Sequence, residues 1–331
     1  MPSKILVTGN LQNPQFDSPQ RREALAKLSN YADEVAYYSD PVFTAKHAEG
    51  VVAVLANSVL FTPEYYAAAK DLKIIARWGV GFDQVNVEVA TEHDVLVTVS
   101  PVHMVAVAEY AITQWLATLK RVYTLNQNSH SGNFQTIRTF EAKDSTLGIW
   151  GMGRIGQTMA ERARALLGEN GRLLVYDTRP DIAEVAAQFN AEVVDHPRVL
   201  FEESDTISLH LSGDDTVVTY DLLCAMKPHA SLINPSRGNL VDDQAVNRAI
   251  KEDRLYYYVV DDPVNGPREI HKDHPRIICT NHNAGITVES AILLDLCCVD
   301  QIIDTLEGRQ PNHILNPDVL ESPRVRSFWN A

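Results

Sequence analysis

Short apolar runs alternate along the chain with segments whose apolar residues recur at helical spacing. This alternation is typical of βαβ units, in which a helix joins each strand to a parallel neighbour. In the first hundred residues the apolar runs predict strands at Lys4–Thr8, Glu34–Tyr38, Val51–Leu55, Ile74–Trp78 and Val95–Thr98. Two helices are expected among them, at Gln20–Asn30 and Pro63–Lys70. The first part of the chain therefore predicts an α/β unit.

The same pattern resumes after residue 145. A long helix is expected over Val105–Val122, and the polar segment Tyr123–Asp144 behind it suits an irregular arm or connection better than a core. Seven further strands are predicted at Thr146–Trp150, Leu173–Asp177, Ala191–Val194, Thr206–His210, Ser231–Asn234, Tyr256–Val260 and Ile277–Thr280. The last long helix is expected over Val288–Leu306, because Gly308 and Pro311 are helix stop signals.

A glycine-rich turn begins where the strand Thr146–Trp150 ends. Residues 151–156 read GMGRIG and fit the pattern GxGxxG. In this pattern Gly151 permits a tight turn, Gly153 lets the backbone approach a pyrophosphate, and Gly156 permits close packing of helix on strand. The apolar residues that follow at four-residue spacing predict a helix that starts in the turn: Ile155, Met159, Ala163 and Leu167.

This turn predicts a dinucleotide site. The start of the helix, at Arg154 and Ile155, would offer free N–H groups and the positive end of the helix dipole to the phosphates. The next strand ends in Asp177, about twenty residues beyond the motif. Its carboxylate would accept hydrogen bonds from the ribose hydroxyls and repel a 2′-phosphate, so NAD is preferred over NADP. Arg179 lies two residues further on and would soften that preference.

The composition argues against several classes of protein. A formal net charge of −14 disfavours a nucleic-acid or anionic-membrane partner, because neither surface attracts an acidic protein. The four cysteines have neither CxxC pairing nor metal-ligand spacing, which indicates reduced thiols and no metal site. Acidic residues interrupt the most apolar late stretch, Ala291–Ile303, so no membrane span is expected. We therefore expect a cytoplasmic protein.

Four segments, taken in order, resemble the D-isomer-specific 2-hydroxyacid dehydrogenases. Leu72–Asp83 (LKIIARWGVGFD) resembles the substrate loop of that family, and Thr146–Gly156 resembles its nucleotide turn. Met226–Val241 (MKPHASLINPSRGNLV) resembles its arginine segment, and Thr280–Thr287 (TNHNAGIT) resembles its histidine segment. Four segments in the family's order are more specific than any single one.

The position of the glycine turn bears on the domain organisation. At 331 residues the chain favours two domains, and the turn lies behind a complete α/β unit. The nucleotide domain is therefore C-terminal, or inserted if the last helix returns to the first unit. We expect the inserted arrangement, with a flavodoxin-like substrate-binding domain over residues 1–99 and 288–331. A Rossmann-type NAD-binding domain would then occupy residues 100–287.

The resemblance also implies roles for single residues. Arg237 would bind the substrate carboxylate and polarise the carbonyl, for which a planar cationic fork is suited. His282 would be the general acid in reduction and the base in the reverse reaction. The loop around Val80 and Gly81 would offer backbone N–H groups to the substrate carboxylate.

On the cofactor side, two residues at strand ends match the family. His210 looks like its cofactor-side histidine, and Asp261 matches the acid that holds the nicotinamide carboxamide. NAD is therefore the expected cofactor.

The third catalytic residue of the family, a glutamate behind the histidine, has no direct counterpart. An alignment without gaps from Asp261 places Gly266 at that position. We expect Asp262 or Glu269 to replace the glutamate, with Asp262 slightly preferred; the alternative is a dyad of Arg237 and His282. Asn281 is a second departure, because the family usually has proline before the histidine.

The substrate side departs as well. Phosphoglycerate-type members carry an arginine after the third strand of the first unit, where this chain reads Ala56-Asn57-Ser58. The substrate is therefore expected to be unphosphorylated. Trp78, beside the glycine loop, either lines the pocket or packs in the core.

Together these features predict reversible hydride transfer between NAD(H) and a small D-2-hydroxy or 2-oxo acid. The long helix and the arm near Tyr123–Phe140 suggest a homodimer, as the resemblance implies. Two rivals remain: a non-catalytic NAD sensor of the corepressor kind on the same fold, and a formate- or phosphonate-type dehydrogenase.

Overall fold

The computed structural model describes residues 2–213, 215–261, 268–272 and 274–330. The chain divides into two compact units. Unit 1 comprises Met1–His103 and Ile286–Ala331, and unit 2 comprises Met104–Gly285. Unit 2 is therefore inserted between the two segments of unit 1, and each unit is described by itself below.

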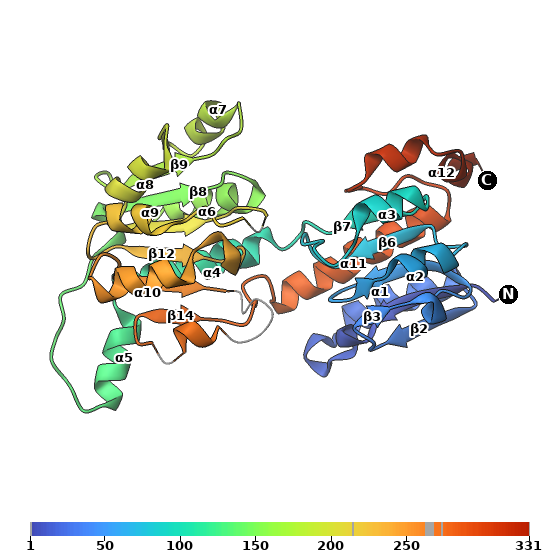
Figure 1. The fold of residues 1–331 in the computed structure, drawn as a ribbon, viewed down its shortest axis with the longest axis horizontal. Helices are drawn as coiled ribbons and strands as arrows, with labels where there is room; N and C mark the ends of the chain where they lie inside the picture. Colours follow the sequence, from blue (N-terminus) through green and yellow to red (C-terminus); the bar gives the residue numbers. More distant parts are fainter. Residues whose placement is uncertain (1, 214, 262–267, 273, 331) are drawn as a thin grey trace. The chain divides into compact units, whose positions relative to one another are not determined.

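In its described residues, unit 1 is built on a five-stranded sheet in which every pairing is parallel (Figure 1). Across the sheet the strands run β2 (Glu34–Tyr38), β1 (Lys4–Thr8), β4 (Val51–Ala56), β6 (Ile74–Arg77) and β7 (Leu96–Val99). Numbered along the chain this order is 2-1-3-4-5, which is the flavodoxin-like order. The prediction for the first unit is thus confirmed. The short strands β3 (Val42–Phe43) and β5 (Leu60–Phe61) pair separately.

Helices cover both faces of this sheet, because successive strand side chains point to opposite faces and both sets are apolar. The α-helices are α1 (Pro19–Lys27), α2 (Pro63–Ala68), α3 (Val87–Glu92), α11 (Val288–Leu306) and α12 (Pro323–Arg326). Short 3₁₀ turns are η1 (Gly9–Gln12), η2 (Pro14–Phe16), η3 (Leu28–Asn30), η4 (Ala45–His47), η8 (Pro317–Glu321) and η9 (Ser327–Asn330). On one face α1 and α11 pack together, and α2 and α3 cover the other.

The described part of unit 2 has a seven-stranded sheet, again with every pairing parallel. Its order is β10 (Glu192–Val193), β9 (Arg172–Tyr176), β8 (Thr146–Trp150), β11 (Thr206–Leu209), β12 (Ser231–Asn234), β13 (Tyr257–Val260) and β14 (Ile277–Cys279). The first six strands follow the Rossmann order 3-2-1-4-5-6. The predicted fold class is therefore confirmed, and the strand order reverses beside β8, where dinucleotides bind in such sheets.

Seven α-helices lie in the described part of unit 2: α4 (Met104–Leu119), α5 (Val122–His130), α6 (Arg154–Arg164), α7 (Ile182–Ala187), α8 (Pro197–Glu203), α9 (Tyr220–Ala225) and α10 (Asp243–Lys251). Its 3₁₀ turns are η5 (Ala142–Asp144), η6 (Gly238–Leu240) and η7 (Glu269–His271). The helices α4, α6 and α7 share one apolar cluster with the sheet, and α8, α9 and α10 share the other. Both faces of the sheet are thereby buried.

The prediction that Tyr123–Asp144 is irregular throughout is wrong for its first part, which is helical as α5. Arg121 adopts a left-handed conformation (φ +51°) that ends α4 and lets α5 start in a new direction. Its guanidinium lies 3.4 Å from the centre of the Tyr256 ring, which holds this turn against the domain. Residues 131–141, called the arm below, are in neither helix nor strand, and Figure 1 shows them in green, running outside the body of unit 2.

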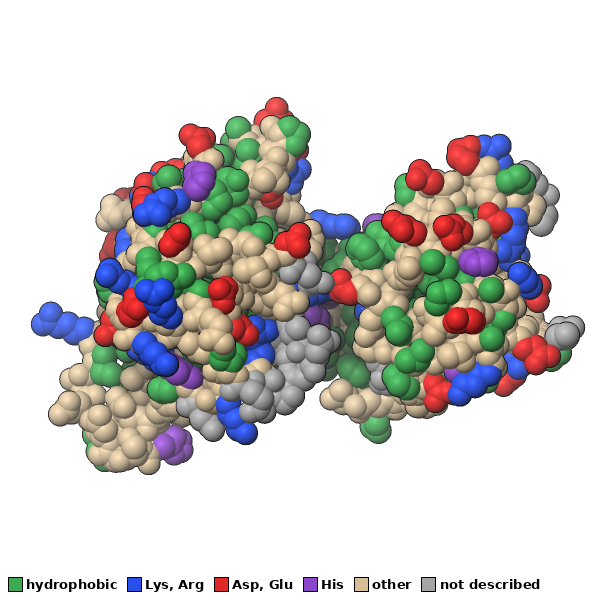
Figure 2. Space-filling view, viewed as in Figure 1, with side chains coloured by type: hydrophobic (Ala, Val, Ile, Leu, Met, Phe, Trp, Pro, Cys, Tyr) green, Lys and Arg blue, Asp and Glu red, His purple; other side chains and the backbone are tan. Residues whose placement is uncertain are grey.

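On the face shown in Figure 2, acidic and basic side chains are interspersed over each unit. None of the helices in the described residues is long and apolar enough to cross a membrane.

Candidate active site

The glycine turn between β8 and α6 leaves room for a ligand at one glycine. Gly151 has φ +99°, and a Cβ there would lie 2.3 Å from the carbonyl oxygen of His210. A Cβ on Gly156 would lie 2.0 Å from the carbonyl oxygen of Gly151. A Cβ on Gly153 would meet no atom within 4 Å. The first two glycines are therefore required by the protein's own packing, whereas Gly153 leaves space that a pyrophosphate would fill.

The start of α6 completes this cradle. Gly153 is the N-cap of α6, and no side chain caps the helix there. Arg154 and Ile155 follow as its first residues, so their N–H groups are available to phosphate oxygens. The residues of the turn thus fit the pyrophosphate of NAD.

Asp177 lies directly beside the turn, at the carboxyl end of β9. One carboxylate oxygen accepts the N–H of Met152 (2.5 Å), and the other accepts the N–H of Arg179 (2.9 Å). The expected ribose-binding acid is therefore next to the phosphate cradle, as the order of β8 and β9 requires.

Arg179 also contacts the turn, which the sequence reasoning did not foresee. Its Nη1 donates to the carbonyl of Met152 (2.9 Å). Its Nε and Nη2 donate to the two carboxylate oxygens of Asp181, at 2.6 and 2.8 Å. Such a two-point pair fixes the orientation of the guanidinium and neutralises its charge.

His210 follows β11 on the side of the glycine turn. Its Nε2 lies 3.0 Å from the hydroxyl of Ser208 and 3.1 Å from the sulfur of Met159. Burial lowers the pKa of His210 to about 3, so the ring is neutral near pH 7. The expected place of His210 on the cofactor side stays a prediction.

The arginine segment is held by two residues that the sequence reasoning missed. Asn234, fully buried at the end of β12, donates through Nδ2 to the carbonyl of Arg237 (2.8 Å) and accepts the N–H of Ser236 (3.1 Å). The Ser236 hydroxyl donates to Leu209 (2.8 Å) and accepts the N–H of Leu211 (3.1 Å). The half-buried Arg237 therefore has a fixed backbone, and the polar residues flanking it in NPSRG were the available signal.

The histidine segment is organised by Asp261, which is only 2% exposed. One of its carboxylate oxygens accepts the Thr280 hydroxyl (2.5 Å) and the N–H of Asn283 (2.9 Å). The other accepts the N–H of Ala284 (2.6 Å). His282, an exposed residue within this turn, has a left-handed backbone with φ +55°. Asp261 thus binds the loop that carries His282, a contact that sequence spacing alone does not reveal.

All these residues follow the carboxyl ends of strands in one parallel sheet, and so lie along one edge of unit 2. From β9 to β14 that edge carries Asp177, the glycine turn, His210, Arg237, Asp261 and His282. This is the edge where open α/β sheets bind ligands.

The acid expected behind His282 is not settled by these contacts. Asp262 and Gly266 lie outside the described residues, and so does the side chain of Glu269. Which residue is the acid behind His282 therefore stays a prediction. In the described part of the chain, no group of His, Cys, Asp and Glu is arranged to hold a metal ion.

The substrate-loop segment follows β6 in unit 1. Gly79 has φ +121°, a conformation suited to glycine, and Val80 is 37% exposed. Gly81 is half-buried beside it. Of the two roles open to Trp78, the core role holds, because the side chain is 5% exposed and its Nε1 donates to the buried Asp295 of α11 (2.8 Å).

The position after β4 reads Ala56-Asn57-Ser58 as expected, but the next strand of the sheet places an arginine beside it. Arg77, the last residue of β6, donates through Nη1 to the side-chain oxygen of Asn57 (3.3 Å). The same Nη1 donates to the carbonyls of Ala56 (3.0 Å) and Trp78 (3.2 Å). A neighbouring strand therefore supplies a cation beside the position where the sequence reads Ala56-Asn57-Ser58.

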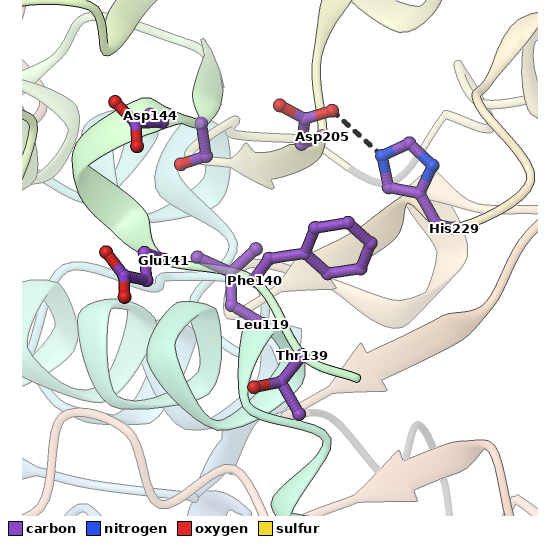
Figure 3. A pocket seen from close by; sticks show the side chains of 8 residues that line it. Leu119, Thr139, Phe140, Glu141, Asp144, Asp205 and His229 are labelled. Carbon is purple, nitrogen blue, oxygen red and sulfur yellow. Dashed lines mark hydrogen bonds and ion pairs between the residues drawn. The ribbon is translucent and has the colours of Figure 1, made fainter. Parts of the chain in front are cut away.

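A pocket of about 370 Å³ lies at the other edge of the unit 2 sheet (Figure 3). Its lining comes from the last residue of α4, the end of the arm and the segments before β8, β11 and β12: Leu119, Thr139, Phe140, Glu141, Asp144, Ser145, Asp205 and His229. The ring of Phe140 stacks on His229 at 4.9 Å, and His229 Nε2 lies 3.0 Å from Asp205. Because these residues precede strands, the pocket is not the nucleotide site.

The family model "D-isomer specific 2-hydroxyacid dehydrogenase, NAD binding domain" matches residues 112–284. A glyoxylate reductase from Thermococcus litoralis is 31% identical over 295 residues, covering 84% of this chain and 86% of the relative. One from Aeropyrum pernix is 28% identical over 324 residues, covering 90% and 94%. The solved structure of a glyoxylate reductase from Paecilomyes thermophila has the same fold, with TM-score 0.79, 22% identity and coverage of 96% and 100%.

Proposed function

Because the chain belongs to the D-isomer-specific 2-hydroxyacid dehydrogenases, we propose that it reversibly reduces a small 2-oxo acid to the D-2-hydroxy acid with NAD as cofactor. Bound NADH supplies the hydride for reduction, and NAD⁺ accepts it in the reverse direction. The observation that carries the proposal is the edge of the unit 2 sheet. There an open glycine cradle and an acid beside it are followed along the same edge by an arginine and a histidine.

Arg237 would bind and orient the substrate. Its guanidinium can pair with the carboxylate through two N–H groups and draw electron density from the neighbouring carbonyl. The hydrogen bonds from Asn234 and through Ser236 support this role, because they fix the backbone from which the side chain extends. Val80 and Gly81 remain predicted backbone donors to the same carboxylate.

His282 would move the proton. As imidazolium it donates to the carbonyl oxygen while the carbon is reduced, and as neutral imidazole it takes the hydroxyl proton back in the reverse reaction. Asp261 supports this role by binding the turn, and one of its oxygens can still accept a carboxamide N–H of the nicotinamide.

A panel of 2-oxo acids tests the function. Purified protein is expected to oxidise NADH with glyoxylate, hydroxypyruvate or pyruvate. Arg237→Gln and His282→Gln should each lower kcat/KM by at least about two orders of magnitude, because each removes a group that acts on the reacting carbonyl. Both variants should still bind NADH, measured by its fluorescence.

The rival functions give different results in the same assay. Nucleotide binding without turnover of any acid would favour the NAD sensor. Reduction of NAD⁺ by formate or a phosphonate, without turnover of 2-oxo acids, would favour the other class of dehydrogenase.

Arg77 bears on the substrate. Arg77 hydrogen-bonds to Asn57, so a basic residue lies beside the position where phosphoglycerate-type members carry their arginine. The panel therefore includes a 2-oxo acid with a phosphate and one with a second carboxylate. A kcat/KM for the phosphorylated acid that exceeds the value for glyoxylate would contradict the prediction of an unphosphorylated substrate.

The acid behind His282 is proposed to be Asp262 or Glu269. A carboxylate that pairs with imidazolium raises the pKa of the histidine, and each unit of pKa corresponds to about 1.4 kcal/mol. Asp262→Asn or Glu269→Gln should therefore shift the histidine-linked limb of the pH–rate profile to lower pH. If neither variant shifts it, Arg237 and His282 act as a dyad.

We also propose that two copies associate through unit 2. The arm supports this, because it runs outside the body of the unit and its Phe134 is 80% exposed. The pocket at the base of the arm lies at the edge of the sheet opposite the cofactor turn, so an association there leaves the nucleotide site accessible.

A further inference from the structure

The backbone of His282 is in a conformation that non-glycine residues rarely adopt. Its φ of +55° lies in the left-handed region, where the Cβ of an L-residue crowds the backbone. Such a residue keeps this conformation only where its surroundings fix it. The contacts that fix the turn therefore determine where the imidazole points.

Asp261 makes those contacts from the end of β13. It accepts the N–H groups of Asn283 and Ala284, the two residues after His282. It also accepts the hydroxyl of Thr280, two residues before His282. A single buried carboxylate thus binds the chain on both sides of the histidine.

The number of hydroxyl protons determines which group donates in each hydrogen bond of this network. A carboxylate only accepts, so the one hydroxyl proton of Thr280 is donated to Asp261. The Thr280 oxygen also lies 2.6 Å from the Tyr110 hydroxyl, and Tyr110 must be the donor of that second bond. Burial raises the pKa of Tyr110, so it keeps its proton at any working pH. The chain of donors therefore runs from Tyr110 on α4 through Thr280 to Asp261.

We propose that Tyr110 and Thr280 are positioning residues for His282, acting through Asp261. Their hydrogen bonds fix the Asp261 carboxylate, which in turn holds residues 281–284 in the one conformation that presents the imidazole to the substrate carbonyl. This inference rests on the proposed role of His282 in proton transfer. It concerns the orientation of the imidazole, so it holds whichever acid stands behind the ring.

Thr280→Val and Tyr110→Phe test the network without altering Asp261, which would disturb the cofactor as well. Thr280→Ser keeps the hydroxyl and is the conservative rescue. Thr124→Val is the matched control, because Thr124 forms the other threonine–tyrosine hydroxyl pair described in unit 2, with Tyr257, away from the histidine turn. For each protein we would measure kcat, KM for the 2-oxo acid and the Kd for NADH. Hydrogen–deuterium exchange of the peptide that covers residues 281–286 gives a readout independent of turnover.

In Thr280→Val, kcat should fall by about one to two orders of magnitude. The imidazole is then in hydrogen-bonding position to the carbonyl oxygen in a smaller fraction of the bound complexes. Exchange in the 281–286 peptide should rise, while the Kd for NADH changes less than about twofold. Tyr110→Phe should show the same changes to a smaller degree. Thr280→Ser and Thr124→Val should match the wild type.

The proposal is overturned if the wild type turns over a 2-oxo acid and both Thr280→Val and Tyr110→Phe keep its kcat and its exchange. Thr280→Val and Thr280→Ser with equal losses would also overturn it. If the wild type reduces no 2-oxo acid, it is the proposed function that fails. Unchanged hydrogen–deuterium exchange of the 281–286 peptide in Thr280→Val would then also exclude the positioning role of Thr280.

Discussion

At the residue scale, Arg179 shows how one ion pair can influence cofactor choice. An arginine two residues beyond the ribose-binding acid is placed to attract a 2′-phosphate. Here Asp181 neutralises it through two hydrogen bonds, and its remaining nitrogen holds the Met152 carbonyl of the glycine turn. The carboxylate of Asp177 is then the uncompensated charge beside the adenosine ribose. It favours NAD because it would repel the 2′-phosphate of NADP.

Asp181→Asn should therefore relax the preference for NAD. Without the carboxylate, the Arg179 N–H groups can donate to a 2′-phosphate, and a charge-assisted hydrogen bond of this kind corresponds to about a tenfold gain in affinity. The ratio of the Kd values for NADH and NADPH, measured by fluorescence titration, should shift toward NADPH by about that factor. Glu202→Gln is the control, because it removes the same charge from the exposed Arg198–Glu202 pair. An equal shift in both variants would mean that net charge alone is responsible.

At the element scale, the connection from β8 to α6 separates glycines needed for folding from a glycine needed for binding. Gly156→Ala places a Cβ against the backbone of Gly151, so α6 must move away from the strand. We expect a loss of about 1–3 kcal/mol in the free energy of unfolding, measured with urea. Gly153→Ala meets no atom and should unfold like the wild type.

For cofactor binding, Gly153→Ala should be the variant with the larger loss. Gly153→Ala fills the space reserved for the pyrophosphate, and its Kd for NADH should rise by about tenfold or more, which corresponds to about 1.4 kcal/mol. A Gly153→Ala protein that binds NADH normally would contradict the assignment of the cradle.

Asp205 ties together the amino ends of three neighbouring strands. It accepts hydrogen bonds from the N–H of Thr146, the first residue of β8, and from Lys227 and His229 before β12. Burial acts to raise the pKa of Asp205, but these hydrogen bonds outweigh it and hold the pKa below its usual range. A lowered pKa means that the ionised carboxylate stabilises the fold above the unfolded-state pKa, about 3.9.

Asp205→Asn should therefore lower the free energy of unfolding by about 1–3 kcal/mol at neutral pH. The difference from the wild type should shrink as the pH falls below about 4 and through the lowered pKa of Asp205 in the folded protein. Urea unfolding at several pH values measures both effects, with Asp195→Asn at an exposed position as the control. A difference that stays constant into acid would show that the charge of Asp205 is not involved.

Elements with strong local signals were predictable from the sequence. The bounds of β1, β2, β8, β12 and α11 agree with prediction, because their apolar runs end at polar or turn residues and α11 ends before Gly308. The helix α5 was missed, because its few apolar residues do not mark a buried face and its start depends on Arg121 packing on Tyr256.

The placement of the candidate site residues was predictable where a motif occupies one segment of chain. Gly153, Asp177, Arg237 and His282 follow the strands from which they were expected to extend. Contacts between strands were not predictable in this way. Arg77 lies twenty positions from Asn57 in the sequence, and only the pairing of β4 with β6 brings them together. The link from Tyr110 to Thr280 likewise depends on how α4 packs on the sheet.

At the scale of the whole molecule, the arm is the feature to test for self-association. Phe134→Ser removes its most exposed aromatic side chain and should shift the mass measured by light scattering from that of two chains to that of one. Leu60→Ser removes an exposed apolar side chain from unit 1 and should leave the dimer intact. A wild type with the mass of a single chain would end the proposal, and a Phe134→Ser dimer would exclude the arm as its basis.

The insertion of unit 2 also has a consequence for biosynthesis. The ribosome makes β1 to β7 first and then all of unit 2, and only afterwards makes α11, whose Leu294, Cys298 and Ile302 cover an apolar face of the unit 1 sheet. The inserted unit is contiguous and can mature as soon as Gly285 has emerged. Until α11 has been synthesised, that apolar face of the first hundred residues stays exposed to solvent. We therefore expect nascent chains stalled before α11 to recruit chaperones through unit 1.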